Sequence, residues 1–345
     1  MKIIKTLAAS AIALGLATGA ATAQDIQLKL HHFLSPKAPA HSQMLAPWAK
    51  RVEEASNGRV SIEIFPSMTL GGKPPQLPRQ ARDGVVDLVW IVNAYAAGAF
   101  PRTEVFELPG VHQGDNAAVN KAMMAMYDDY LAEDFKGVIP MFQHVHQGQA
   151  MQMASDQIRS PADLAGKKIR VPSRTGSWVL EALGASPVQT SVGEIPVALS
   201  KKVIDGALIP WEIIPALKIH EVTDYQIEGP GGKRLGTTSF SVLMNEAKWD
   251  SLPADIQAIF REVSNADWHA EVGKVWAEAD AHGIEVAVNS GNTHIQLTEE
   301  EWGAFDARTA SVVDRWIADM DAKGIDGRAL YDRAVELVNQ NMASN

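Results

Sequence analysis

The sequence predicts an α/β fold with two lobes. Two stretches of the chain, 27–92 and 168–209, each alternate between strand-like and helix-like periodicity, which is the pattern of α/β domains built on parallel sheets. The chain has 345 residues, and chains longer than about 250–300 residues usually divide into more than one domain. Apolar residues make up 46% and charged residues 21% of the chain, a mixture that can fill two cores.

The first stretch predicts three strands joined by two helices. Residues 27–33 and 59–65 alternate in polarity, so each is expected to be a half-buried strand. Residues 85–92 form a continuous apolar run, which favours a strand buried on both faces, as parallel strands usually are. Apolar residues recur at helical spacing within 40–55, and a second helix is expected at 76–83.

The second stretch repeats this alternation without repeating the sequence. Strands are expected at 168–171 and from 186 onward, with a helix at 175–184 between them. Residues 201–209 run from the end of a helix into a further strand. Residues 239–245 are apolar enough for a strand that crosses between the lobes.

The C-terminal third predicts helices. Residues 250–288 are helix-rich, and a capping box at Thr298 and Glu301 predicts the start of an almost wholly helical end. The tryptophans of this region are expected to pack helices together rather than to contact a ligand: Trp249, Trp268, Trp276, Trp302 and Trp316.

Residues 1–23 have the features of a cleavable secretory signal peptide. Lys2 and Lys5 precede an apolar run from 7 to 17, and small residues end the segment at 21–23. The run is shorter than the roughly 20 apolar residues that span a bilayer, which disfavours the alternative of a short membrane anchor. We therefore expect a mature chain that begins near Gln24 and works in the periplasm.

Charge and motifs exclude several classes of function. The formal net charge is −10, which disfavours nucleic acid and anionic membranes as partners. Cysteine is absent, and the signatures of zinc hydrolases, serine hydrolases and nucleotide-binding enzymes do not occur. The histidines at 31–32, 144 and 146 show no spacing that demands a metal. The sequence thus predicts neither an enzyme nor a bound cofactor or metal.

Six segments, matched in order and spacing, resemble the solute-binding proteins of tripartite ATP-independent periplasmic (TRAP) transporters: 52–66, 70–72, 81–88, 160–172, 182–187 and 244–249. The resemblance implies a two-lobed periplasmic binding protein with mixed sheets, crossing strands and a long connecting helix. It places lobe I at 24–147 with 235–275 and lobe II at 148–234 with 276–345. It also implies a small carboxylate ligand and a membrane permease as partner.

The same resemblance assigns the ligand's carboxylate to Arg170, which lies in the strand at 168–171. A guanidinium can hold a carboxylate through two parallel, charge-assisted hydrogen bonds. The alternative, a surface salt bridge, is disfavoured because the apolar neighbours Ile169 and Val171 suggest a strand in which an unpaired arginine would be costly.

Other positions depart from the acidic-sugar binders that the chain resembles. Where those proteins carry polar groups, this chain has Phe33, the pair Val92–Asn93, Ala150 beside Gln149, and Ile209. Polar groups are therefore replaced largely by apolar ones. Asn93 and Gln149 remain candidates for polar contacts with the ligand.

Aromatic residues near these positions predict the class of ligand. A pocket that combines one arginine with Phe33, Trp90 or Tyr95, and Trp211 suits a carboxylate on a flat apolar body, such as a hydroxybenzoate. Trp211 is the best placed, because it follows a strand end, where α/β ligand crevices form. Glu212 could accept a ligand hydroxyl or hold a cation beside the carboxylate.

Several alternatives remain open at this level. The ligand could be a 2-oxo or 2-hydroxy acid or a C4-dicarboxylate, with or without a cation. The scaffold could carry a secreted enzyme, since fold alone does not fix function. A binding component of an ATP-driven importer or a signalling receptor would have similar lobes, although the order of the TRAP-like segments disfavours it.

Overall fold

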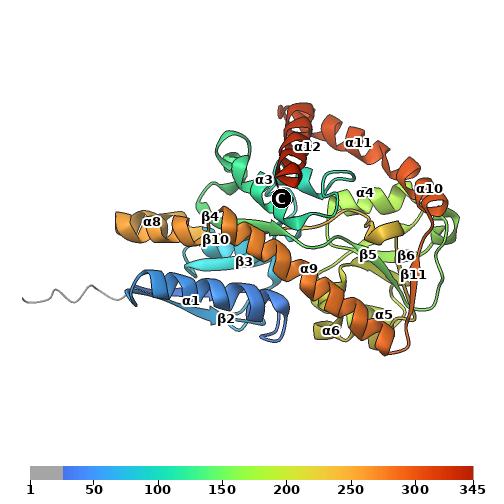
Figure 1. The fold of residues 1–345 in the computed structure, drawn as a ribbon, viewed down its shortest axis with the longest axis horizontal. Helices are drawn as coiled ribbons and strands as arrows, with labels where there is room; N and C mark the ends of the chain where they lie inside the picture. The colour runs from blue at the N-terminus through green and yellow to red at the C-terminus, as the bar shows by residue number, and fades with distance from the viewer. Residues whose placement is uncertain (1–25, 345) are drawn as a thin grey trace, which may run out of the picture.

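The computed structural model describes residues 26–344, which form two mixed sheets surrounded by helices (Figure 1). The predicted signal peptide lies outside the described residues. The first sheet has the strand order β2-β1-β3-β10-β4. Its strands are β1 (Ile26–His31), β2 (Val60–Phe65), β3 (Leu88–Val92), β4 (Val138–Val145) and β10 (Ser239–Asn245).

The first sheet combines parallel and antiparallel pairs. β1 runs parallel to both β2 and β3, as the predicted strand–helix–strand units require, while β10 inserts antiparallel between β3 and β4. Every residue of β3 is buried, in agreement with its continuous apolar sequence. The predicted helix at 40–55 is a π-helical turn (Ala40–Leu45) followed by α1 (Ala46–Ala55), and α2 (Leu77–Arg82) leads into β3.

The second sheet has the order β11-β9-β5-β8-β6-β7. Its strands are β5 (Ala150–Met153), β6 (Lys168–Val171), β7 (Ser186–Gln189), β8 (Gly206–Ile209), β9 (Tyr225–Glu228) and β11 (Thr293–Gln296). The helices between them are α4 (Arg174–Ala182), α5 (Ile195–Ser200) and α6 (Ile214–Leu217). β6 is parallel to β7 and β8, whereas β5 is antiparallel to β8 and β9, so this sheet is mixed as well.

The two sheets are joined by crossing segments and by one long helix. The chain passes from β4 to β5 at 146–149 and returns from β9 to β10 at 229–238. The long helix α9 (Ala266–Asn289) then runs past both sheets (Figure 1). Two of its glycines allow close packing: a Cβ at Gly273 would lie 2.7 Å from the backbone nitrogen of Ala117, and one at Gly283 would lie 2.0 Å from the carbonyl oxygen of Trp211.

The remaining α-helices pack around the two sheets and on one another: α3 (Asn116–Ala125), α7 (Glu246–Ser251), α8 (Ala254–Val263), α10 (Glu299–Thr309), α11 (Ser311–Asp321) and α12 (Gly327–Ala343). The predicted capping box is present, since Thr298 N–H donates to Glu301 Oε2 at 2.8 Å and Glu301 N–H donates to Thr298 Oγ1 at 3.2 Å. α12 packs on α3, beside the first sheet. The predicted division into lobes at these boundaries stays a prediction.

The tryptophans of the C-terminal third are all buried, as expected from their helical spacing. Arg51 lies over the ring of Trp268, and Trp302 stacks on Phe305. Within residues 26–344, none of the helices is both long and apolar enough to span a membrane.

Candidate functional site

A cavity lies where the two sheets and the crossing segments meet. The first sheet contributes Trp90 and Phe240 to its wall, and the second contributes Arg170 and Ile209. Trp276 of α9 completes the wall. Small-molecule sites commonly form at the interface between domains, so this is the candidate ligand site.

Arg170 supplies the positive charge of the cavity. It lies in β6 opposite Ala207, and only 2% of its surface is exposed. Nε and Nη2 donate to the carbonyl oxygen of Thr190 at 2.9 and 2.7 Å, Nη1 donates to that of Leu208 at 3.3 Å, and Nη2 also donates to the Tyr95 hydroxyl at 3.1 Å.

These partners are all uncharged, and Arg170 takes part in none of the ion pairs among the described residues. Burial lowers the pKa of the Arg170 guanidinium, but arginine stays charged at neutral pH. A buried charge without a counter-ion is costly. The arrangement therefore suits an anion that enters the cavity.

Tyr95 connects the two sheets at the edge of the cavity. It follows β3, and its hydroxyl accepts hydrogen bonds from Arg170 and from the backbone N–H of Val192, the latter at 2.8 Å. Phe33, Tyr95 and Pro172 line both the cavity and a wider neighbouring cleft. These side chains therefore lie between the two spaces, and the hydrogen bonds of Tyr95 connect them to the second sheet.

One wall of the cavity is a stack of aromatic rings. Phe33 and Trp90 are stacked with centroids 4.9 Å apart, and Trp90 and Phe240 are stacked at 5.3 Å. Trp276 continues the stack against Phe240 at 5.7 Å. The Trp90 indole N–H donates to His144 at 2.9 Å, which fixes the ring. Such a wall offers a flat apolar surface that can pack against a planar ligand.

Gln149 and Glu212 bring polar atoms to the same cavity. The Gln149 amide donates to Thr238 Oγ1 at 2.7 Å, and its Oε1 is buried without a hydrogen-bond partner. Glu212 Oε2 is also buried without a partner. Burial, followed by the nearby charge of Asp280, raises the pKa of Glu212 well above its ordinary value, which favours the protonated form of this side chain.

Two of the predicted site residues do not line the cavity. Trp211 is fully buried behind it, where its indole N–H donates to Glu228 at 2.9 Å and its ring meets the edge of His294. Asn93 donates to Ser239 Oγ at 3.2 Å and faces a separate small pocket. The structure therefore brings together Arg170 with Phe33, Trp90, Tyr95, Gln149 and Glu212, and leaves these two outside.

Some cavity residues were not among the sequence-based candidates. Phe240 lies in the crossing strand, where the sequence predicts a strand but does not show which faces meet the cavity. Trp276 was expected to be a packing residue. It does pack on His144 at 5.0 Å, but it also lines the cavity. His146 and Thr238 lie in the crossing segments, whose sequence carries no periodic signal.

The histidines have individual structural partners. His31 contacts Gln80 Oε1 at 2.8 Å, and His32 contacts His41 at 2.9 Å. Burial lowers the pKa of His32 and of His144 to about 3, and that of His146 well below its ordinary value, so all three are neutral at neutral pH. Residues 26–344 contain no group of three or more His, Cys, Asp or Glu side chains arranged to hold a metal.

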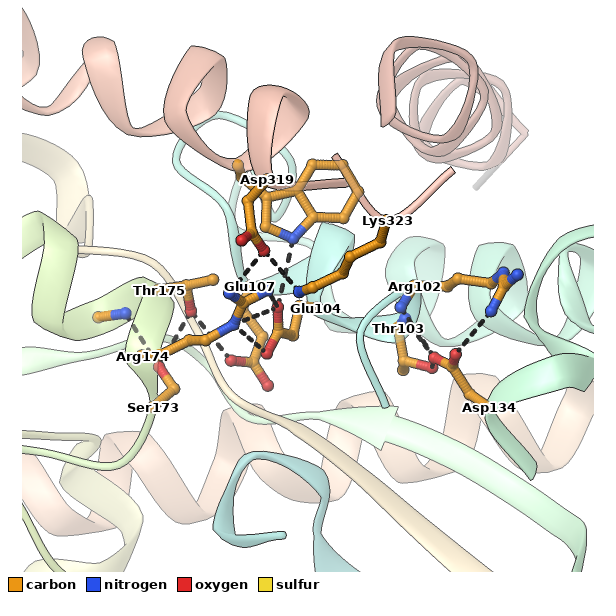
Figure 2. A network of polar contacts seen from close by, with 12 residues as sticks. Arg102, Thr103, Glu104, Glu107, Asp134, Ser173, Arg174, Thr175, Asp319 and Lys323 are labelled. Carbon is orange, nitrogen blue, oxygen red and sulfur yellow. Dashed lines mark hydrogen bonds and ion pairs between the residues drawn. The ribbon is translucent and has the colours of Figure 1, made fainter. Parts of the chain in front are cut away.

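A second polar cluster links the sheets away from the cavity (Figure 2). Arg174, at the start of α4, donates from Nη2 to Glu104 at 2.6 Å and from Nη1 to Asp319 of α11 at 2.6 Å. Glu107 accepts from the Ser239 hydroxyl at 2.7 Å and from the Thr175 hydroxyl at 3.2 Å. We call these contacts the interlobe network, because Glu104 and Glu107 follow the first sheet whereas Arg174 and Thr175 follow β6 of the second.

Glu107 is a titratable member of this network. Burial raises the pKa of Glu107 from 4.5 to about 7, although the hydrogen bonds from Ser239 lower it. Between about pH 4.5 and 7 the folded protein keeps a proton that the unfolded chain releases, so the stability contributed by this group falls as pH rises through that window.

We therefore expect Glu107→Gln to stabilise the protein above pH 7, by on the order of 2–3 kcal/mol, and to have little effect near pH 4.5. The amide keeps an acceptor for Ser239 and removes the penalty for ionisation. Urea denaturation at pH 5 and pH 8 measures this, with the exposed Glu54→Gln as control. A variant that is less stable than wild type at pH 8 would contradict the account.

The comparisons with known proteins agree with this architecture. The model of the bacterial extracellular solute-binding protein family 7 matches residues 30–319. A TRAP solute-binding protein from Rhodoferax ferrireducens T118, solved in complex with copurified benzoate, is 36% identical with a TM-score of 0.89, covering 92% of this chain and 99% of its own. A marine metagenome TRAP solute-binding protein specific for aromatic acid ligands, solved with 3-hydroxybenzoate, is 35% identical with a TM-score of 0.89 and the same coverage.

Curated relatives agree at lower identity. The C4-dicarboxylate-binding periplasmic protein DctP of Rhodobacter capsulatus is 26% identical over 326 residues, covering 92% of this chain and 94% of its own. Another relative, 28% identical over 293 residues, is longer, and this chain spans 52% of its length. The predicted fold class and family are thus confirmed: the chain belongs to family 7 of the bacterial extracellular solute-binding proteins and is a solute-binding protein of the TRAP type.

Proposed function

We propose that the protein is the periplasmic receptor of a TRAP transporter for an aromatic carboxylate, which it delivers to the membrane permease. Arg170 carries this proposal, because it is a buried guanidinium with only uncharged partners, set in a cavity whose wall is the stack of Phe33, Trp90 and Phe240. The guanidinium fixes the carboxylate, and the stack receives the ring. The similar proteins bound to benzoate and 3-hydroxybenzoate support this choice.

A C4-dicarboxylate, the ligand class named for DctP, fits these residues less well. Arg170 is the cationic side chain in the wall of the cavity, and His146 beside it is neutral. A second carboxylate would meet Glu212 and the aromatic rings, where no charge compensates it. A 2-oxo or 2-hydroxy acid with a cation would instead require an ionised Glu212, against the raised pKa of that group.

The proposed mechanism is closure on the ligand. Because the cavity takes its lining from both sheets, a ligand there contacts both lobes and stabilises their closed arrangement by its differential affinity for it. Tyr95, which bonds Arg170 and Val192 across the lobes, makes part of the same closed arrangement. The closed form is what the permease would recognise, and delivery of the ligand involves no chemical step.

A thermal-shift panel tests the proposal. Benzoate should raise the melting temperature, because ligand linkage adds about 2.7 kcal/mol of stability at a concentration about a hundredfold above Kd. Succinate and glucuronate at equal concentration serve as controls and should leave it unchanged. Stabilisation by succinate or glucuronate but not by benzoate would refute the aromatic assignment.

A further inference from the structure

Three of the side chains that line the cavity each have a buried polar atom without a hydrogen-bond partner: Gln149 Oε1, Glu212 Oε2 and Trp276 Nε1. Buried polar atoms in folded proteins are nearly always paired, since leaving one unpaired is costly. Three such atoms around one cavity therefore point to a group on the ligand that pairs with them. Arg170 does not account for them, because it serves the ligand's carboxylate.

Each of the three side chains is held in place by other contacts. The Gln149 amide donates to Thr238, and its backbone N–H donates to the carbonyl oxygen of Gly236 at 2.8 Å. Trp276 is fixed by stacking on Phe240 and His144. Glu212 lies in the turn that α9 packs against at Gly283. Each of the three side chains is thus fixed before a ligand binds.

Strand register separates this set from Arg170. Arg170 lies opposite Ala207 in β8, whereas Ala150 pairs with Ile209, so that Gln149 and Glu212 both lie beyond the end of β8. The end of β8 at Ile209 is roughly 7 Å along the strand from Ala207. A ligand held by its carboxylate at Arg170 would reach these atoms with the far part of its ring.

The hydrogen-bonding character of the three atoms selects one functional group. Gln149 Oε1 is an acceptor and Trp276 Nε1–H is a donor. Glu212 can act as a donor as well, because its burial beside Asp280, whose own charge is paired with Arg234 at 2.9 Å, favours the protonated carboxyl. The other titratable side chains of the cavity are Arg170, Tyr95 and the neutral His146. A hydroxyl has one donor and two lone pairs, which matches one acceptor and two donors.

We propose that Gln149, Glu212 and Trp276 form a hydroxyl subsite, so that the preferred ligand is an aromatic acid with a ring hydroxyl, which donates to Gln149 Oε1 and accepts from Trp276 Nε1–H and the Glu212 carboxyl. This inference rests on the proposed function, since it requires an aromatic carboxylate at Arg170. It adds a specificity: an apolar substituent at the same place leaves all three polar atoms unpaired.

Calorimetric titration with benzoate, 3- and 4-hydroxybenzoate, and 3- and 4-methylbenzoate tests the subsite. At least one hydroxybenzoate should bind at least about tenfold more tightly than benzoate. It should also exceed, by a similar factor, the methylbenzoate that carries its methyl group at the same ring position. Equal affinity for the hydroxy, methyl and unsubstituted acids would overturn the subsite and leave the aromatic receptor standing. If none of these acids binds, the proposed function fails together with the subsite.

Single substitutions test which side chains produce the preference for a ring hydroxyl. Trp276→Phe, which keeps an aromatic ring but removes the donor, and Gln149→Met should each weaken hydroxybenzoate binding more than benzoate binding, and so reduce the preference for the hydroxyl. Glu212→Gln keeps a donor and should retain the preference, whereas Glu212→Met should reduce it. Gln152→Met is the matched control, because Gln152 is a buried glutamine with unpartnered amide atoms that does not line the cavity. Variants that weaken benzoate and hydroxybenzoate equally, or an equal effect of Gln152→Met, would overturn the assignment.

Discussion

Replacing Arg170 with alanine is expected to abolish detectable binding of aromatic carboxylates. The substitution leaves the ligand's carboxylate buried without a counter-ion, and breaking a buried ion pair from one side costs about 3–5 kcal/mol. At about 1.4 kcal/mol for each factor of ten, affinity falls by at least roughly a hundredfold. Arg170→Lys should recover little, because an ammonium cannot supply two parallel hydrogen bonds.

Calorimetry with benzoate measures this effect, and a thermal melt verifies that the variant is folded. Arg79→Ala is the control, since the Arg79 side chain is 83% exposed and pairs only with Asp83 in its own helical turn. The control should bind as wild type does. Near-native affinity of Arg170→Ala would remove Arg170 from the site.

The largest expected effect on stability comes from Gly283→Ala. The added Cβ would lie 2.0 Å from the carbonyl oxygen and 2.4 Å from the carbonyl carbon of Trp211, both backbone atoms that cannot rotate away. α9 and the turn after β8 would have to separate, at a cost of about 3 kcal/mol. Because Pro210 and Glu212 of that turn line the cavity, ligand affinity should fall as well.

Gly303→Ala is the matched control. Gly303 lies within the helix α10, and a Cβ there would have nothing within 4 Å. Alanine should therefore stabilise this helix by about 0.5–1 kcal/mol. Chemical denaturation of both variants gives the comparison. A Gly283→Ala protein as stable as wild type would show that the packing of α9 on this turn is looser than described.

Local sequence patterns were sufficient for most of the fold. Strict alternation identified the strand at β2, and the continuous apolar run identified the buried β3. The capping box at Thr298 marked the start of α10. These signals work because each depends on the chain's own period and on its immediate neighbours. The antiparallel insertion of β10 depends on distant pairing, and no local period encodes it.

The site was harder to predict, because the direction of each side chain is decided by tertiary contacts. The segment after β8 presents Pro210 and Glu212 to the cavity, while Trp211 turns back to bond Glu228 of β9. Trp276 has the helical spacing of a packing residue, and its sequence cannot show that one edge of the ring faces a cavity. Arg170 was assigned from the resemblance to the TRAP proteins, and its apolar neighbours indicated the burial that the structure shows.

A crystal structure of the protein with benzoate tests the central claim most directly. The account predicts that both carboxylate oxygens accept hydrogen bonds from the Arg170 guanidinium while the ring lies in the cavity against Phe33, Trp90 or Phe240. Benzoate bound outside this cavity, or inside it with the carboxylate turned away from Arg170, would contradict the account.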